Sequence, residues 1–423
     1  MKYKTLCTYV LLIVIILIVF NGCTNNVSNI SSDPTESERY SLENSEWHLL
    51  TDWAGAIYGA AGDKGYYYIT TNFDGSFLIN YLDYTSQNHT VLCSKPDCQH
   101  NDDTCNAWIS PNQGGVVPLV VDESVLIFSR GNDISAEYEA SPQVIRMDLS
   151  GNNREVLLKL SSSEEFIPPF ISDGRTIICI YRKYDASGNA PIVENSIIAI
   201  DSHTGTLQKM HELDSSFYSI IGSFLDGIFL VKRSENNRTL LGYYPDTNTF
   251  KELSSWNTED KSVFVTETGY GFVNRNGNIE VYNSPEFQKY DLPNLTIRLD
   301  ENLGINSFRF MNFFDDKAIF ELIYLSDNGP ITKILGFSMK DNQLKEITLY
   351  TDYLGVQDPI DIVGILSTKL VVISNLKHQE VTLLDNYGIP IQSKSLVYQY
   401  ALIDKNDYWN SIPNYAEFES IWF

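Results

Sequence analysis

Three cysteines and one histidine lie close enough together in this chain to hold a metal ion. Cys93, Cys98, His100 and Cys105 follow the spacing Cys-x₄-Cys-x-His-x₄-Cys. Three thiolates and an imidazole suit tetrahedral Zn²⁺ in structural sites, and four protein ligands leave no position for a catalytic water. These residues therefore predict a structural zinc ion that pins a loop and takes no part in catalysis.

A disulfide between Cys98 and Cys105 is the alternative. Disulfides persist in exported proteins, and this pairing would leave Cys93 as a free thiol. Three local cysteines are an awkward number for disulfides and a natural one for a site of three cysteines and a histidine. Free thiols are the remaining possibility, and all three interpretations stay open. Cys179 lies in an apolar stretch, where we expect a small core residue.

The N-terminus predicts export and a lipid anchor. Two lysines precede Val10–Phe20, an unbroken apolar run that is too short for a membrane span of about 20 residues but suits a signal peptide. Gly22-Cys23 follows almost directly, which resembles the lipobox of bacterial lipoproteins. The resemblance implies that residues 1–22 are removed and that Cys23 carries acyl chains, palmitate among them. An uncleaved signal anchor is the competing interpretation.

Composition separates an anchor region from a folded region. Residues 23–46 are dominated by Asn, Ser, Asp and Glu, so they cannot bury enough apolar surface to fold, and we expect a flexible, lipidated tether. The chain carries 54 acidic and 30 basic residues, which argues against nucleic acid as a partner. We therefore expect a protein attached through its lipid to the extracytoplasmic face of the cell membrane.

Residues 47–423 are predicted to form an all-β domain. Tyr and Phe number 26 and 21, and no window shows a sustained helical period. One kind of turn precedes an apolar strand seven times, about 51 residues apart from Asp63 to Ser367. These turns are Gly62–Gly65, Asp122–Glu123, Asp173–Gly174, Asp226–Gly227, Thr268–Gly269, Asp315–Asp316 and Ser367–Thr368.

A second kind of turn alternates with the first. It has an apolar residue, then Asp or a substitute, then small polar residues, which favour tight turns. Its copies begin at Leu82, Met147, Ile200, Tyr244, near Asn283, near Ser338 and at Leu384-Asp385-Asn386-Tyr387-Gly388.

Seven units of two hairpins predict a β-propeller of seven four-stranded blades. Six or eight blades, a pair of β-sandwiches and a β-solenoid are the alternatives. The cysteine segment would follow the outer strand of the first blade. Two segments are expected to close the ring, His48–Leu50 and the C-terminal aromatic residues Tyr408, Trp409, Tyr415, Phe418, Trp422 and Phe423.

The lipobox, the Asn- and Ser-rich tether, the repeated turns and the segment Leu92–Ala107 together resemble a group of Firmicute lipoproteins. The folded part of these proteins is similar to the β-propellers of the low-density-lipoprotein-receptor kind. The resemblance implies a location and a fold, and it implies no activity.

The sequence favours a non-catalytic function. It contains no Gly-x-Ser-x-Gly or His-Glu-x-x-His motif, and Ser172-Asp173-Gly174 is only a turn. We favour a binding or scaffolding module for a protein, peptide or glycan, working through the propeller face or its central channel. The alternative is a glycan-active hydrolase with two carboxylates near the channel. Paired carboxylates abound, as in Asp315–Asp316 and Asp358 with Asp361, but in so acidic a chain we expect most of them to be solvated turns.

Overall fold

The computed structural model describes residues 47–419, which belong to one unit, Asn44–Phe423. Within that range it does not describe residues 52–58, 73, 114, 131–140, 186–191, 215, 225, 258–260, 267–268, 275–277, 284–286, 292–304, 327–328, 354–355 and 385–389. The predicted signal peptide, Cys23, the tether, Trp422 and Phe423 therefore lie outside the described residues. No helix in the described part of the chain is long and apolar enough to cross a membrane.

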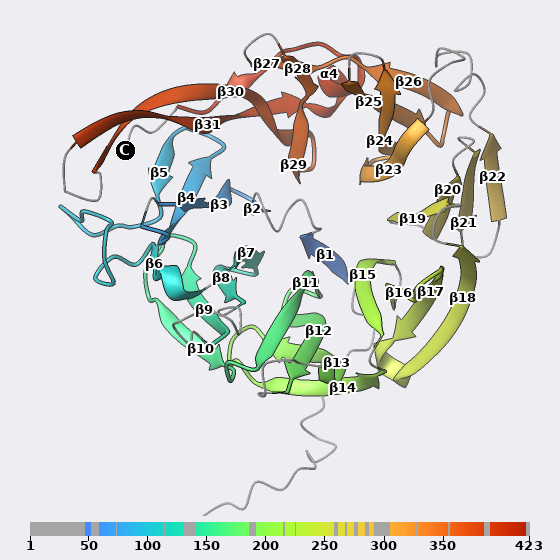
Figure 1. Ribbon diagram of the computed structural model, residues 1–423, viewed down its shortest axis with the longest axis horizontal. Helices are drawn as coiled ribbons and strands as arrows, with labels where there is room; N and C mark the ends of the chain where they lie inside the picture. The colour runs from blue at the N-terminus through green and yellow to red at the C-terminus, as the bar shows by residue number, and fades with distance from the viewer. Residues whose placement is uncertain are drawn as a thin grey trace, which may run out of the picture. The chain divides into compact units, whose positions relative to one another are not determined.

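The described strands form seven antiparallel sheets of four strands around a centre, with the first strand of each sheet innermost (Figure 1). The prediction of a seven-bladed β-propeller is confirmed, and the sandwich, the solenoid and the other blade numbers are wrong.

The strands of blades 1 to 4 are as follows. Blade 1 has β2 (Gly59–Ala61), β3 (Gly65–Thr71), β4 (Phe77–Asp83) and β5 (His89–Val91); blade 2 has β7 (Val116–Val121), β8 (Ser124–Ser129), β9 (Gln143–Asp148) and β10 (Glu155–Lys159); blade 3 has β11 (Glu164–Ser172), β12 (Thr176–Tyr184), β13 (Ile192–Asp201) and β14 (Leu207–Leu213); blade 4 has β15 (Phe217–Phe224), β16 (Gly227–Arg233), β17 (Asn237–Tyr244) and β18 (Thr249–Asn257).

The strands of blades 5 to 7 are as follows. Blade 5 has β19 (Lys261–Thr266), β20 (Gly269–Asn274), β21 (Asn278–Asn283) and β22 (Phe287–Asp291); blade 6 has β23 (Ile305–Phe314), β24 (Lys317–Ser326), β25 (Gly329–Ser338) and β26 (Gln343–Ile347); blade 7 has β29 (Asp361–Ile365), β30 (Lys369–Leu384), β31 (Pro390–Asp404) and β32 (Ala416–Glu417).

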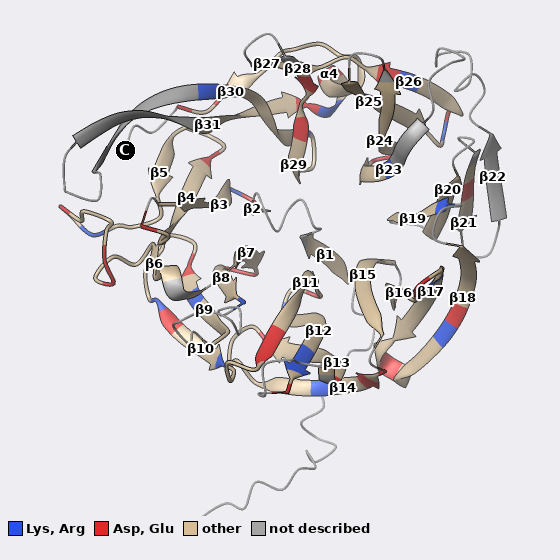
Figure 2. Ribbon diagram, in the orientation of Figure 1, with Lys and Arg blue, Asp and Glu red and all other residues tan. Residues whose placement is uncertain are grey.

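A few further elements are additional to the four-stranded blades. They are β1 (His48–Thr51), β6 (Trp108–Ile109), the hairpin of β27 (Tyr350–Tyr353) and β28 (Val356–Pro359), the short 3₁₀ turns η1 (Pro111–Gln113) and η2 (Pro245–Thr247), and α4 (Lys405–Trp409). Acidic and basic residues are interspersed around the ring, and the outer strands β10, β14 and β18 each carry both signs (Figure 2).

The hydrophobic core lies between neighbouring blades. The second strand of a blade is buried on both faces, which explains why it is apolar at successive positions, as in Ile177–Ile180 of β12. Between blades 2 and 3, the ring of Phe128 lies 5.2 Å from that of Phe166 and 4.5 Å from that of Phe170, measured between centroids. Blade-to-blade packing of this kind is what makes every blade depend on its neighbours.

The first family of turns is confirmed throughout the described chain. Each of these turns joins the first and second strands of a blade, from Gly62–Gly65 in blade 1 to Ser367–Thr368 in blade 7; Thr268 itself lies outside the described residues. The second family joins the third and fourth strands in blades 1 to 6. In an antiparallel meander these two connections lie at the same end of the sheet, so both families share one face of the ring. We name it the turn face, and the other the opposite face.

The seventh member of the second family is wrong. Residues 385–388 themselves lie outside the described residues, but Leu384 ends β30 and Pro390 begins β31, so the chain between them joins the second and third strands and not the third and fourth. The true equivalent is Asp404, which caps α4 by accepting a hydrogen bond from the Asn406 N–H at 3.1 Å. The N–H of Lys405 donates to the Thr368 carbonyl at 3.1 Å, as that of Tyr84 donates to Lys64 at 3.0 Å in blade 1. The long β30–β31 hairpin hides this equivalence in the sequence.

The predicted ring closure is half right. β1 does not join the last blade; it pairs with β11 of blade 3, in the centre of the ring (Figure 1). Among the described strands, none of blade 7 pairs with one of blade 1. This boundary, which we call the seam, is instead closed by packing of buried side chains from both blades. They are Tyr66, Tyr68 and Leu82 of blade 1 with Val371, Ile373, Tyr400, Leu402 and Phe418 of blade 7.

The C-terminal aromatic residues serve two boundaries. Phe418 is buried at the seam, and the N–H of Glu419 donates to the Gln87 carbonyl of blade 1 at 2.9 Å. Tyr408, fully buried, packs between blades 6 and 7, with Trp409 and Tyr415 against the same cluster. The part of this stretch that is described therefore does contribute to closure.

The last residue of the third strand fixes the second turn by its carboxylate. Asp201 is 3% exposed, and it accepts hydrogen bonds from the N–H of Thr204 at 2.8 Å and from Nε of Arg175 at 2.8 Å. Burial alone would raise the pKa of Asp201, but these hydrogen bonds hold it well below its ordinary value. A lowered folded-state pKa stabilises the protein above the unfolded pKa of about 3.9 and loses that contribution as pH falls further.

Asp201→Asn is accordingly expected to lower the free energy of unfolding by about 2 kcal/mol at pH 7, because a charged acceptor of several hydrogen bonds is lost. The difference from the wild type should shrink as the pH falls below about 4, because the unfolded wild-type chain then takes up a proton on this carboxylate before the folded protein does. Urea unfolding at pH 7 and pH 3 measures both. Asp63→Asn, at an exposed first-family turn, is the matched control; an equal loss in the two variants would contradict the assignment.

Candidate metal centre

The fourth strand of blade 1 is interrupted, and the interruption carries the predicted ligands. β5 and β6 both pair with β4, and residues 92–107 run between them. The two ends of this excursion meet at one residue of β4: the N–H of Leu92 donates to the Ile79 carbonyl at 2.9 Å, and the N–H of Ile79 donates to the Ala107 carbonyl at 3.0 Å. The blade thus closes the neck of a loop, which brings Cys93 and Cys105 together.

All four predicted ligands converge. The donor atoms of Cys93, Cys98, His100 and Cys105 lie within 4.8 Å of one another. Nδ1 of His100 lies 3.2 Å from Sγ of Cys105, and the backbone of His100 is left-handed, with φ of 56°. Thiolates on a tetrahedral zinc with bonds of about 2.3 Å stand roughly 3.8 Å apart. The donor set and its spacing fit such an ion with small adjustments.

Burial and hydrogen bonding shift the pKa values of Cys93 and Cys105 in opposite directions. Burial raises the pKa of Cys105, which is 1% exposed, to about 12. Burial acts on Cys93 too, but backbone N–H groups of Lys95 and Asn106 hydrogen-bond its sulfur, and the net effect lowers the pKa of Cys93. All four cysteines of the described residues are free thiols in the structure, and Cys179 is fully buried in the core, as predicted.

Hydrogen bonds from the neighbouring blade, blade 2, hold the loop of residues 92–107 in place. Nη1 of Arg154 donates to the carbonyls of Asn106 at 2.9 Å and Trp108 at 2.5 Å, and the amide of Asn106 donates to the Gly151 carbonyl at 2.9 Å. Gly151 has φ of 78°, and a Cβ there would lie 2.3 Å from the Leu92 carbonyl oxygen, so only glycine fits. The loop therefore fastens blade 1 to the second-family turn of blade 2. Sequence reasoning missed Arg154, because nothing near it in the chain marks it as a partner of the cysteines.

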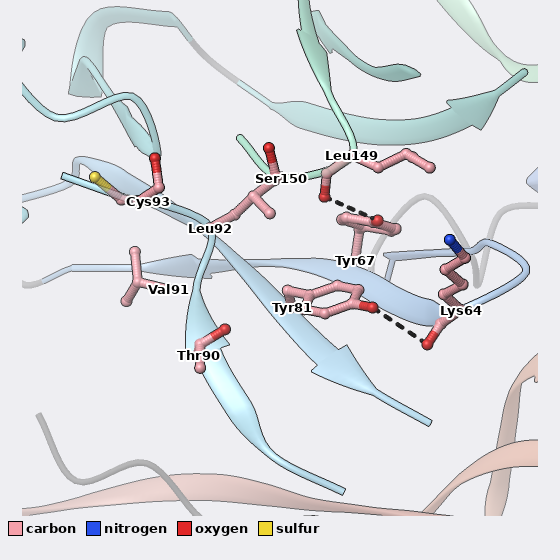
Figure 3. Close-up of a pocket in the computed structure, with 10 residues that line it drawn as sticks. Lys64, Tyr67, Tyr81, Thr90, Val91, Leu92, Cys93, Leu149 and Ser150 are labelled. Carbon is pink, nitrogen blue, oxygen red and sulfur yellow. Dashed lines mark hydrogen bonds between the residues drawn. The ribbon is translucent and has the colours of Figure 1, made fainter. Parts of the chain in front are cut away.

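An open hollow of about 470 Å³ lies beside the neck, between blades 1 and 2 (Figure 3). Its walls are mostly apolar and are held by two tyrosine hydroxyls, since Tyr67 donates to the Leu149 carbonyl at 3.1 Å and Tyr81 to that of Lys64 at 3.2 Å. The full lining is Lys64, Tyr67, Tyr81, Thr90, Val91, Leu92, Cys93, Ser94, Leu149 and Ser150.

The carboxylates of Asp315 and Asp316, the first candidate catalytic pair, have structural partners. Asp315 accepts from Nζ of Lys405 at 2.9 Å, and Asp316 accepts from the hydroxyl of Ser338 at 2.6 Å. Burial alone would raise the pKa of Asp316, but Ser338 and Lys317 hold it at about 2. Both residues lie in a turn on the turn face.

The second carboxylate pair is divided between two elements. Asp358 lies in the β27–β28 hairpin and Asp361 begins β29. Ser172-Asp173-Gly174 is a first-family turn, as predicted.

No protein-family model matches the chain, and none of the curated proteins matches it. Several solved structures are similar at about one residue in ten identical. A prolyl endopeptidase gives a TM-score of 0.48 at 10% identity, and the match covers 86% of this chain but only 56% of the peptidase. The β-propeller domain of the Trilobed protease from Pyrococcus furiosus gives 0.45 at 10% identity, with 88% of this chain and 99% of that one covered. An ulvan lyase gives 0.46 at 9% identity, with the same coverage. At such identity a shared activity does not follow.

Proposed function

We propose that this protein is a lipid-anchored lipoprotein on the extracytoplasmic face of the cell membrane, and that its propeller is a non-catalytic binding module. The anchor rests on the apolar run Val10–Phe20 and on Gly22-Cys23 after it. The likeness of the sequence to Firmicute lipoproteins with receptor-like propellers supports the same location.

The binding role is supported by how the ring uses its own polar groups. The carboxylates of Asp201, Asp315 and Asp316 are occupied by backbone N–H groups, lysines or hydroxyls of the protein. The centre of the ring holds β1, which contacts the inner strands β2, β7, β11 and β15. The outer faces are then the surfaces best suited to a protein, peptide or glycan partner, and an exposed aromatic such as Phe217, 59% exposed, is a favourable anchor.

The Cys/His cluster supports a structural zinc within this module. Four protein ligands close a tetrahedral site, so the ion would hold the loop and the adjoining turn of blade 2 and would not bind substrate. Cys93, Cys98, His100 and Cys105 would be its ligands.

Cys23→Ser is the direct test of the anchor. The variant is expected to lose all incorporation of labelled acyl chains and to move from the membrane fraction to the soluble fraction, because the thiol is the site of acylation. Fractionation, metabolic labelling and the N-terminus of the mature wild type measure this. Cys7→Ser, inside the signal peptide, is the control that should change neither property. Acylation that persists in Cys23→Ser, or a mature chain that begins elsewhere, would contradict the anchor.

The soluble Cys23→Ser chain then serves as the probe for the binding role. We expect glycan or peptide arrays to show saturable binding, with no release of new reducing ends or amino groups from the bound species. Turnover of a bound species would contradict a non-catalytic module.

A further inference from the structure

The direction of β1 shows where the chain enters the ring. His48 pairs with Ser172, and Leu49 pairs with Ile171, in antiparallel register. Ser172 is the last residue of β11, directly before the turn at Asp173–Gly174 on the turn face. β1 therefore starts at the turn face and runs through the centre toward the opposite face.

The position of Trp47 independently places the entry of the chain at the turn face. Its side chain is 4% exposed, and its carbonyl accepts a hydrogen bond from the hydroxyl of Ser223. Ser223 pairs with Ile228, one pair before the β15–β16 turn, which also lies on the turn face. The entry point thus lies near the first-family turns of blades 3 and 4. Because β1 also contacts β2 and β7, this point is near the axis of the ring (Figure 1).

From this entry point we infer that the turn face is directed at the membrane and that the opposite face is presented outward to partners. The inference rests on the proposed lipid anchor at Cys23. A flexible segment of the length of residues 23–46 has a mean end-to-end distance of about 27 Å. To turn the opposite face toward the membrane, it would have to pass along the blade and over the rim. The three spacings of about 4.8 Å that separate four strands, with eight residues at about 3.3 Å each, make that path roughly 40 Å.

The outward orientation leaves exposed apolar side chains where a partner can reach them. Phe217 begins β15 at the opposite face, with the guanidinium of the buried Arg182 lying 5.0 Å from its ring centroid. Leu325, 55% exposed, stands near the end of β24 at the same face. The Cys/His loop, fastened to a second-family turn of blade 2, lies at the rim nearer the membrane.

Two labels on one blade test the orientation. Thr247 lies in the exposed β17–β18 turn on the turn face, and Asn236 lies in the exposed β16–β17 turn on the opposite face. Each is replaced in turn by a click-reactive unnatural amino acid carrying a donor fluorophore, which leaves the cysteines untouched. The acylated full-length protein is placed in phosphatidylglycerol–phosphatidylethanolamine vesicles with an acceptor lipid. Energy transfer from position 247 should exceed that from 236 about twofold, because β17 separates the labels by roughly 25 Å.

Equal transfer from both positions, or stronger transfer from 236, would overturn the orientation. A protein that fails to join the vesicles would instead contradict the lipid anchor. In that event the chain from residue 24 onward, with an N-terminal histidine tag on a nickel-chelating lipid, repeats the comparison. The tagged chain enters the ring at the same point as the acylated chain, so this comparison tests the orientation independently of natural acylation.

Discussion

A chain that ends at Pro359 is expected to lose cooperative folding altogether. The truncation removes blade 7, which covers the buried side chains of blade 6, such as Phe314 and Ile319, and those of blade 1, such as Tyr66 and Tyr68. Two large apolar surfaces would then be exposed to water. The free-energy cost of exposing each one is larger than the stabilisation that a single blade supplies. Circular dichroism during urea unfolding should show no sigmoidal transition, and the product should aggregate.

The matched control ends at Glu419. It keeps Phe418 at the seam and the N–H of Glu419 that donates to Gln87, and it should unfold at the wild-type urea concentration. A chain ending at Pro359 that stayed soluble and unfolded cooperatively would show that the blades do not depend on a closed ring.

Cys105→Ser is expected to reduce bound zinc from about one ion per chain to background. Cys105 is the most buried of the four proposed ligands and sits at the neck of the loop, so its loss removes one of the four donors that close the site. Elemental analysis of protein purified without added metal measures the loss, beside intact mass under non-reducing conditions. Acidification should release zinc from the wild type, because the ligands must be deprotonated to bind it.

Cys179→Ala is the control, since Cys179 is a buried core residue outside the cluster and its loss should leave the zinc content unchanged. A wild-type mass lower by two hydrogens, with no zinc, would assign the site to a disulfide between Cys98 and Cys105. Cys93 would then be a free thiol.

The blades could be predicted from sequence because their signals are local. Asp, Gly and Asn specify tight turns within four or five residues, and a doubly buried strand such as Val125–Phe128 must be apolar at successive positions. The convergence of Cys93, Cys98, His100 and Cys105 was predictable for the same reason, since they are close in sequence. The blade only had to close the loop, which it does at Ile79.

The missed features all depend on distant partners. β1 has only four residues and nothing in them selects β11, so its place was invisible in the sequence. Arg154 reaches the loop from the next blade. Asp404 does carry a readable signal, an apolar residue followed by Asp and a polar run, but Leu384-Asp385 imitates it nineteen residues earlier. Local patterns cannot rank two such copies, because the length of the β30–β31 hairpin decides between them.

The seam has a consequence for the order in which the molecule folds. Among the described strands, the four of each blade come from one stretch of the chain, and blade 7 takes none from the N-terminal side of blade 1. Each blade can therefore form as soon as its own residues are available, because its hairpins close over short stretches of chain. Ring closure by an exchanged strand would instead leave the first strand unpaired until synthesis ended, open to association with other chains. Here the pairing of β1 with β11 can occur once blade 3 exists, and the seam between blades 7 and 1 is the final contact to form.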